Sequence, residues 1–265
     1  MRVGSWRCLL ALAHGVMAPM LGAHAAEIEV DAFNTYSVPP FFTSTGRGLD
    51  MEVVDYLNRR LQGAYHLKLS VLPRERLLKR HLSPPQQFAG LSLFMAPQFV
   101  DDMAQQQFLW SPPLFEDQNM LIFLGPQRGR LPRLEDLKGL RFGGVLGYRY
   151  EGLDEMAATG LLVKENASSA QASLRQVCLG RVDFTQMSRV MFDAMVAESG
   201  CADHLALQPV PHSTPFGRRI MVGRALPELA ARISEAVEQM PCDRQWRGVA
   251  AAYRITLAAC RGTVH

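Results

Sequence analysis

The stretch Glu27–Phe42, EIEVDAFNTYSVPPFF, decides the fold. Its opening residues alternate between polar and apolar side chains, which is the pattern of a β-strand. The Pro39–Pro40 pair that follows excludes both a helix and a central strand, so the chain must leave the strand in an irregular loop. The sequence therefore predicts a strand whose carboxyl end opens into a rigid loop that carries Tyr36 and Phe41.

Helices and strands alternate over the rest of the first hundred residues. Apolar residues of Val53–Leu61 recur at helical spacing, and His66–Leu72 alternates as a second strand. Pro73 opens another helix, and Phe88–Met95 is a third strand. This order predicts a mostly parallel sheet with helices on its faces.

The same pattern returns in the second half of the chain, which predicts a second α/β unit followed by a return to the first. We expect an α/β protein of two lobes, with residues 26–118 and 212–265 in lobe 1 and residues 119–211 in lobe 2. Ligand sites in such proteins lie at the carboxyl ends of strands and at domain junctions. Further strands are expected at Leu121–Leu124, Leu140–Val145, Val182–Thr185, Leu205–Val210 and Ile220–Val222.

The N-terminal residues are typical of a cleaved export signal. Two arginines precede an uncharged and mostly apolar stretch, Cys8–Leu21, and Ala23–Ala25 places small residues at the two positions that a signal peptidase reads. We expect cleavage after residue 25 and a mature chain in the periplasm. A short membrane anchor or a buried first helix is the alternative, which Pro19 within the apolar stretch disfavours.

The charge balance bears on nucleic-acid binding, and the cysteines bear on disulfide bonding. The chain has 265 residues with 28 Lys+Arg against 25 Asp+Glu, a balance that gives no argument for nucleic-acid binding. Cleavage would leave Cys178, Cys201, Cys242 and Cys260 in an oxidising compartment, where they predict disulfides. Three pairings are open; we favour 178–201, at the ends of successive helices, and 242–260 if the tail folds back. No CxxC motif is present, and we expect no metal or cofactor.

Five short segments follow one another along the chain: Tyr36–Phe41 (YSVPPF), Gly48–Val53 (GLDMEV), Trp110–Leu114 (WSPPL), Leu134–Leu140 (LEDLKGL) and Leu179–Asp183 (LGRVD). In this order they resemble segments of family 3 extracellular solute-binding proteins, the amino-acid-binding type used by ABC transporters. The resemblance covers nearly the whole mature chain. It implies a two-lobed periplasmic binding protein of type II fold, a small-molecule ligand, a membrane permease as partner and a monomeric state.

Three contacts by which this family holds an α-amino acid are missing. The arginine that binds the ligand carboxylate has no counterpart in Ala96–Met103, and the family's Gly-Thr turn is replaced by Gly147-Tyr148. The aspartate that binds the ligand ammonium aligns with Ser188. The resemblance with these departures implies a small anionic or aromatic ligand rather than a standard zwitterionic amino acid.

Seven residues at predicted strand ends or in the matching segments are candidate ligand contacts. Aromatic rings can cover a planar ligand, and a guanidinium can bind an anion through two hydrogen bonds. The alternatives are core packing for the aromatic residues, a solvated surface for the arginines and a helix cap for Ser188. The candidates are Tyr36, Phe41, Arg76, Trp110, Tyr148, Arg149 and Ser188.

Catalysis has little support in the sequence. It contains no G-x-S-x-G, no H-E-x-x-H and no P-loop motif, so we expect a binding protein and not an enzyme. Two alternatives stay open: a ligand-sensing receptor for a membrane signalling partner, and a dehydratase-like enzyme of the kind found among a few relatives of this fold. Glu116, Asp117 and Glu151 are the acids that such an enzyme would draw on.

Overall fold

The computed structural model describes Met1 and residues 27–43, 46–125 and 133–260. The predicted signal peptide lies outside these residues apart from Met1, so its cleavage stays a prediction. None of the helices in the described part of the chain has both the length and the apolar character that crossing a bilayer requires.

The first sheet contains the strand predicted from the opening stretch. Its order is β2-β1-β3-β11-β4, and β5 also pairs with β11. The pairs β1–β2 and β1–β3 are parallel, whereas β11 is antiparallel to each of its partners. The strands are β1 (Ile28–Asn34), β2 (Tyr65–Val71), β3 (Leu91–Met95), β4 (Leu109–Trp110), β5 (Phe115–Asp117) and β11 (Phe216–Val222).

The second sheet repeats this arrangement. Its order is β10-β6-β9-β7-β8, with β7 parallel to β8 and β9 and with β6 antiparallel to β9 and β10. The predicted α/β fold is confirmed, and each sheet is mixed because the chain crosses into it on one antiparallel strand. The strands are β6 (Asn119–Leu124), β7 (Arg141–Val145), β8 (Val163–Ala167), β9 (Phe184–Ser188) and β10 (Leu205–Pro209).

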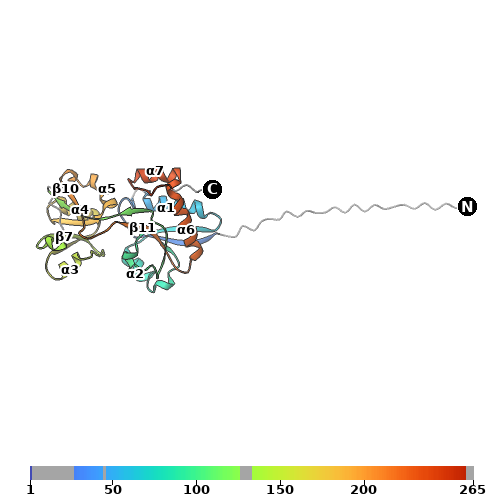
Figure 1. The fold of residues 1–265 in the computed structure, drawn as a ribbon, viewed down its shortest axis with the longest axis horizontal. Helices are drawn as coiled ribbons and strands as arrows, with labels where there is room; N and C mark the ends of the chain where they lie inside the picture. The colour runs from blue at the N-terminus through green and yellow to red at the C-terminus, as the bar shows by residue number, and fades with distance from the viewer. Residues whose placement is uncertain (2–26, 44–45, 126–132, 261–265) are drawn as a thin grey trace.

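Helices cover both sheets, and Figure 1 shows the two units side by side, with α1, α6 and α7 around one and α3, α4 and α5 around the other. Ser169 and Asp243 cap α4 and α7 by accepting hydrogen bonds from Ala172 N (3.1 Å) and Trp246 N (2.8 Å). The α-helices are α1 (Leu49–Leu61), α2 (Arg74–Arg80), α3 (Leu153–Ala158), α4 (Ala170–Cys178), α5 (Arg189–Met195), α6 (Pro227–Gln239) and α7 (Arg244–Ala252). Short 3₁₀ helices are η1 (Pro85–Gln87), η2 (Pro97–Val100), η3 (Leu134–Leu137), η4 (Val196–Glu198), η5 (Ala202–His204) and η6 (Met240–Cys242).

Two segments carry the chain between the units. It leaves the first sheet after β5 and returns on β11, and these strands pair with Asp117 opposite Phe216 and Phe115 opposite Arg218. The two crossings therefore lie side by side at the junction. The lobe boundaries expected at 118/119 and 211/212 stay predictions.

Both favoured disulfides are confirmed. Cys178 and Cys201 are bonded with their Cα atoms 5.7 Å apart, and Cys242 and Cys260 with theirs 4.8 Å apart. The second bond required the tail to fold back after α7. It does so at Ile255, which is buried and whose N–H donates to Ala250 O over 2.8 Å.

Replacing both Cys178 and Cys201 by alanine should lower the free energy of unfolding by about 3 kcal/mol, because the bond closes a loop between residues 23 positions apart. For a chain of this size that corresponds to a fall in Tm of about 6–12 °C in calorimetry. The Cys242→Ala/Cys260→Ala variant should lose a similar amount. A Cys178/Cys201 variant that melts with the wild type would contradict the expected loss.

Candidate functional site

The carboxyl ends of the parallel strands of both sheets meet at the junction between the two units. Arg149, after β7, has its Nη1 atom 3.7 Å from Asp101 Oδ2, which follows β3. A methyl group at Gly147 would lie 3.7 Å from the side chain of Glu75 in α2. The β7–α3 loop of the second unit therefore lies directly against the first unit.

A hollow of about 180 Å³ opens at this contact. The first unit lines it with residues that include Arg74, Phe99 and Asp101, and the second contributes Gly147 and Arg149. It is thus built by both units. This is the arrangement expected of a site that holds a ligand between two lobes.

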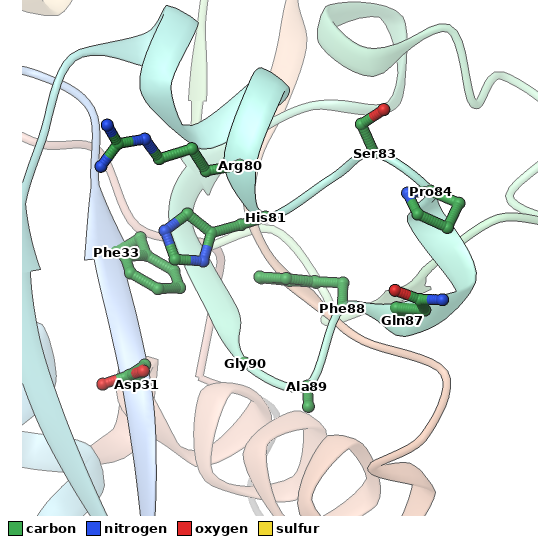
Figure 2. Close-up of a pocket in the computed structure, with 10 residues that line it drawn as sticks. All are labelled: Asp31, Phe33, Arg80, His81, Ser83, Pro84, Gln87, Phe88, Ala89 and Gly90. Atoms are coloured by element: carbon green, nitrogen blue, oxygen red, sulfur yellow. The ribbon is translucent and has the colours of Figure 1, made fainter.

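A larger hollow of about 250 Å³ lies elsewhere, on the first unit alone (Figure 2). The ring of His81 packs on Phe33 with the centroids 4.5 Å apart, and Asp31, Arg80 and Phe88 also line the hollow. None of the described residues of the second unit contributes to its lining. We therefore place the candidate site at the smaller hollow.

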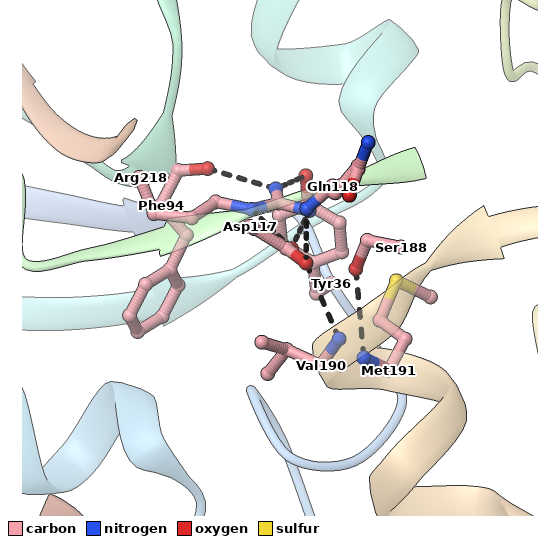
Figure 3. A network of polar contacts seen from close by, with 8 residues as sticks. All are labelled: Tyr36, Phe94, Asp117, Gln118, Ser188, Val190, Met191 and Arg218. Atoms are coloured by element: carbon pink, nitrogen blue, oxygen red, sulfur yellow. Dashed lines mark hydrogen bonds and ion pairs between the residues drawn. The ribbon is translucent and has the colours of Figure 1, made fainter. Parts of the chain in front are cut away.

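Arg218 is buried where the two crossing strands pair (Figure 3). Its Nε and Nη2 atoms lie 3.0 and 2.9 Å from Asp117 Oδ2. Its Nη1 donates to Phe94 O over 3.1 Å and to the hydroxyl of Tyr36. The pair is fully internal, because only 2% of the Arg218 side chain and none of the Asp117 side chain is exposed.

Backbone strain accompanies this contact. Phe94 has φ of 58°, in the left-handed region that bulky residues seldom adopt. The register of β3 against β11 shifts at the same place, between Arg219 and Met221. The Phe94 carbonyl accepts a hydrogen bond from Arg218 instead of continuing the regular hydrogen-bond ladder between β3 and β11. Backbone strain of this kind persists only where surrounding contacts enforce it.

Four aromatic rings enclose the guanidinium of Arg218. The centroids of Tyr36, Phe41 and Phe216 are each 5.1 Å from it, and that of Phe99 is 5.3 Å away. At these distances the ring faces attract a cation. Burial alone would lower the pKa of Arg218, but Tyr36 and Asp117 more than reverse that effect, so the pKa lies above its ordinary value and the side chain stays charged.

Asp117 also connects the crossing strands to the second unit. Its Oδ1 accepts hydrogen bonds from Gln118 N (2.9 Å) and from Val190 N (3.2 Å) at the start of α5. Ser188 caps the same helix by accepting from Met191 N over 3.5 Å. The carboxylate thus joins β5, β11 and α5 in one network, which Figure 3 shows.

Tyr148 projects from the β7–α3 loop and packs against the cores of both units. Burial is the main reason why its pKa is raised to about 12. The Tyr36 hydroxyl adds to the rise, while Arg218 and Arg74 oppose it. The phenol of Tyr148 is therefore protonated at neutral pH.

The loop that carries Tyr36 and Phe41 is fixed by Asn34, the buried last residue of β1. Its Nδ2 donates to Tyr36 O (3.1 Å), Phe41 O (3.4 Å) and Asp50 Oδ2 (2.8 Å), and its Oδ1 accepts from Tyr36 N (2.9 Å). Asn34 thus joins the strand end, the loop and α1.

The structure brings three of the predicted site residues together and places Arg149 at the rim. Tyr36 and Phe41 belong to the aromatic enclosure of Arg218, and Tyr148 packs against the hydrophobic cluster that contains them. Arg149 is largely exposed where it pairs with Asp101. Their roles as ligand contacts stay predictions.

The other three predicted site residues are not among those that line the hollow. Trp110 donates its Nε1–H to Asp102 Oδ2 over 2.9 Å, and Ser188 serves as a helix cap. Arg76 is exposed, whereas its neighbour Arg74 lines the hollow, lies 5.4 Å from the centroid of Phe99 and donates to Phe99 O. The first turn of α2 turns Arg74, not Arg76, toward the junction.

Sequence reasoning missed Arg218 and the role of Asp117. The alternation of Phe216, Arg218 and Ile220 was the available signal, because side chains two apart in a strand share a face. The expected strand began only at Ile220. The sequence also pointed to Gln186 beside Ser188 as a source of neutral hydrogen bonds; its Oε1 is buried in the middle of β9 with no partner among the described residues.

Asp102 accepts the hydrogen bonds that fix the segment around Trp110, so the stability of this segment should depend on pH. It accepts from the N–H groups of Gln106, Gln107 and Phe108 over 2.7–3.1 Å, as well as from Trp110. Burial alone would raise the pKa of Asp102, but these hydrogen bonds outweigh it and the pKa is lowered. The carboxylate thus stabilises the fold above its unfolded pKa of about 4, and this stabilisation is lost as pH falls through the lowered value.

Asp102→Asn should accordingly lower the free energy of unfolding by about 2 kcal/mol at pH 7, because the hydrogen bonds lose their charged acceptor. Urea titrations at pH 7 and pH 3 measure it, and the difference from the wild type should shrink at the lower pH. An equal difference at both pH values would contradict the assignment.

Asp117→Ala should lower the free energy of unfolding by about 3–5 kcal/mol, because it leaves the buried Arg218 unpaired. The double variant Asp117→Leu/Arg218→Met removes both charges and should lose clearly less. Asp55→Ala is the matched control, since its carboxylate pairs with Arg47 at the exposed surface, and should change the free energy of unfolding by less than about 1 kcal/mol. A double variant as unstable as Asp117→Ala would contradict this account.

The known proteins most useful for comparison are solved structures. No family model matches the sequence, and no curated protein matches it. An ancestral arginine-binding protein bound to arginine is 19% identical, with a TM-score of 0.64 over 85% of this chain and 97% of that chain. An arginine transport system periplasmic binding protein from Legionella pneumophila is 16% identical, with a TM-score of 0.62 over 86% and 100% of the two chains.

A third similar structure comes from work on glutathione import by GshT and the cystine ABC importer TcyBC of Streptococcus mutans. It is 13% identical, with a TM-score of 0.70 over 89% of this chain and 99% of that chain. At such identities the likeness establishes the fold and not the ligand. The chain therefore has the two-lobed α/β fold of family 3 solute-binding proteins, from which its sequence is divergent.

Proposed function

We propose that the chain is a periplasmic solute-binding protein that captures a small molecule between its two lobes and delivers it to the permease of an ABC transporter. The observation that carries this proposal is the hollow at the junction, which the strand ends of both units line. The likeness of fold to transport-associated binding proteins supports it. We infer that the mature chain acts as a monomer and needs no cofactor.

The junction also provides a hinge for ligand capture. The two crossing strands β5 and β11 pair with each other, and the Asp117–Arg218 pair is buried between them. Rotation of the units about these strands would open and close the site while this pair stays intact. A ligand favours the closed form to the extent that it binds that form more tightly.

Arg74 is the side chain that we assign to an anionic group of the ligand. It is half-buried, lines the hollow and lies over the ring of Phe99, so it is less hydrated than a surface arginine. A guanidinium of this kind binds a carboxylate or phosphate through two hydrogen bonds. Ser188, which stands where related proteins have an ammonium-binding aspartate, is engaged as a helix cap.

Burial excludes Asp117 as one of the three candidate catalytic acids of the dehydratase-like alternative. Asp117 is fully buried against Arg218 and backbone N–H groups, so it has no access to a substrate. Glu116 and Glu151 are exposed. This leaves solute binding as the function that the site supports best.

Arg74→Ala should weaken ligand binding about tenfold, the effect of losing one charge-assisted contact. Arg76→Ala is the matched control: it removes the same charge two residues away, outside the hollow, and should change the affinity less than twofold. The ligand is first identified by native mass spectrometry of protein purified from the periplasm, and affinities follow from isothermal titration calorimetry. Equal effects of the two variants would contradict the role of Arg74.

The membrane partner distinguishes transport from sensing. Crosslinking in intact cells, followed by purification of this protein, should recover a transporter permease. Recovery of a membrane signalling protein instead would favour the receptor alternative, and purified protein that carries and binds no small molecule would contradict both.

A further inference from the structure

The hollow at the junction has one positive charge that the chain does not compensate. The charged side chains among the described residues of its lining are Arg74, Asp101 and Arg149. Arg149 and Asp101 face each other from the two units, with Nη1 and Oδ2 3.7 Å apart. No carboxylate of the described residues pairs with Arg74, so the lining as a whole favours a ligand that carries a single negative charge.

The guanidinium of Arg74 is held in place by the first unit and still has donors for a ligand. Its Nη2 donates to Phe99 O, and its Cζ lies 5.4 Å from the centroid of the Phe99 ring. A guanidinium carries five N–H donors in a fixed fork, of which this hydrogen bond uses one. A carboxylate can therefore form a two-point bond to a side chain whose position is already restricted, which reduces the entropy lost on binding.

Most of the other side chains that line the hollow are apolar. Leu78 is 36% exposed although it is apolar, so part of this lining meets water when no ligand covers it. Removing such a surface from water is favourable, and an apolar group of a ligand would do so. We call these residues the apolar wall: Leu78, Leu82, Pro85, Phe99, Val100 and Phe108.

The volume of the hollow limits the apolar group to one ring. The hollow measures about 180 Å³, and an apolar protein cavity of about 150 Å³ holds a benzene molecule. A six-membered ring with a short carboxylate arm matches this size. The rings of Phe99 and Phe108 in the apolar wall favour an aromatic ring over other apolar groups, because aromatic pairs gain from packing against each other.

We propose that the hollow binds an aromatic monocarboxylate of one ring, such as phenylacetate. The carboxylate pairs with Arg74, and the ring lies against the apolar wall. An amine of the same shape is rejected, because its cation would meet Arg74. A small dicarboxylate is disfavoured, because its second charge would meet either the apolar wall or Asp101. This inference rests on the proposed solute-binding function and names its substrate class.

The test separates the contribution of the ring from that of the charge. Phenylacetate, benzylamine, acetate and succinate are titrated by calorimetry into the purified mature protein, which is first dialysed to remove bound solute. We expect phenylacetate to bind about tenfold or more tightly than acetate or succinate, because only phenylacetate covers the apolar wall. Benzylamine should show no measurable binding, because it carries the same ring with the opposite charge.

Leu78→Ala tests the apolar wall without disturbing the core, because Leu78 is partly exposed. It should weaken the binding of phenylacetate about threefold to tenfold, since fewer apolar carbons then cover the ring. Leu161→Ala is the matched control: Leu161 is 40% exposed and is not among the residues that line the hollow, so the affinity should change less than about twofold. Thermal melting verifies that both variants fold.

Three outcomes overturn the inference: phenylacetate does not bind, benzylamine or succinate binds as tightly as phenylacetate, or the two leucine variants have equal effects. Solute capture survives each of them if mass spectrometry finds another small molecule with the periplasmic protein. The proposed function fails separately, when no small molecule is found with the protein and none of the probes binds.

Discussion

The buried ion pair between Arg218 and Asp117 is the interaction on which the junction depends. It joins the two strands by which the chain leaves and re-enters the first unit, and its other hydrogen bonds reach the Tyr36 loop, the Phe94 carbonyl and the start of α5. A guanidinium inside a protein is tolerable only if its charge and its N–H groups are met. That requirement fixes the positions of all these partners at once.

The need to compensate the buried charge of Arg218 explains both the unusual backbone of Phe94 and the aromatic rings around the guanidinium. Phe94 holds a left-handed conformation inside a strand because its carbonyl is needed as an acceptor for Arg218. Four aromatic side chains converge from the β1 loop, η2 and β11 because their ring faces stabilise the cation. Replacing such a pair by apolar residues is often neutral for stability, so the pair organises the junction without being evidence of a strong fold.

Most of the fold follows from local patterns, and most of the site does not. The alternation in EIEVDAF predicted β1, helical spacing predicted α1, and the alternation of helices and strands implied two α/β units, all of which the structure contains. The strand β8 was missed because it lies at the edge of its sheet with mostly exposed residues, so it lacks an apolar repeat. Arg76 was chosen over Arg74 because the sequence of a helix start does not say which residue faces a neighbouring unit.

The buried carboxylate at the junction is compensated within the chain itself. A binding protein that leaves an interior carboxylate free will attract a ligand cation, whereas here the interior carboxylate is compensated by a residue of the chain itself. Specificity is then a matter of which groups remain uncompensated. At this junction Arg74 is such a group, because it is half-buried in the lining of the hollow and no carboxylate of the described residues pairs with it.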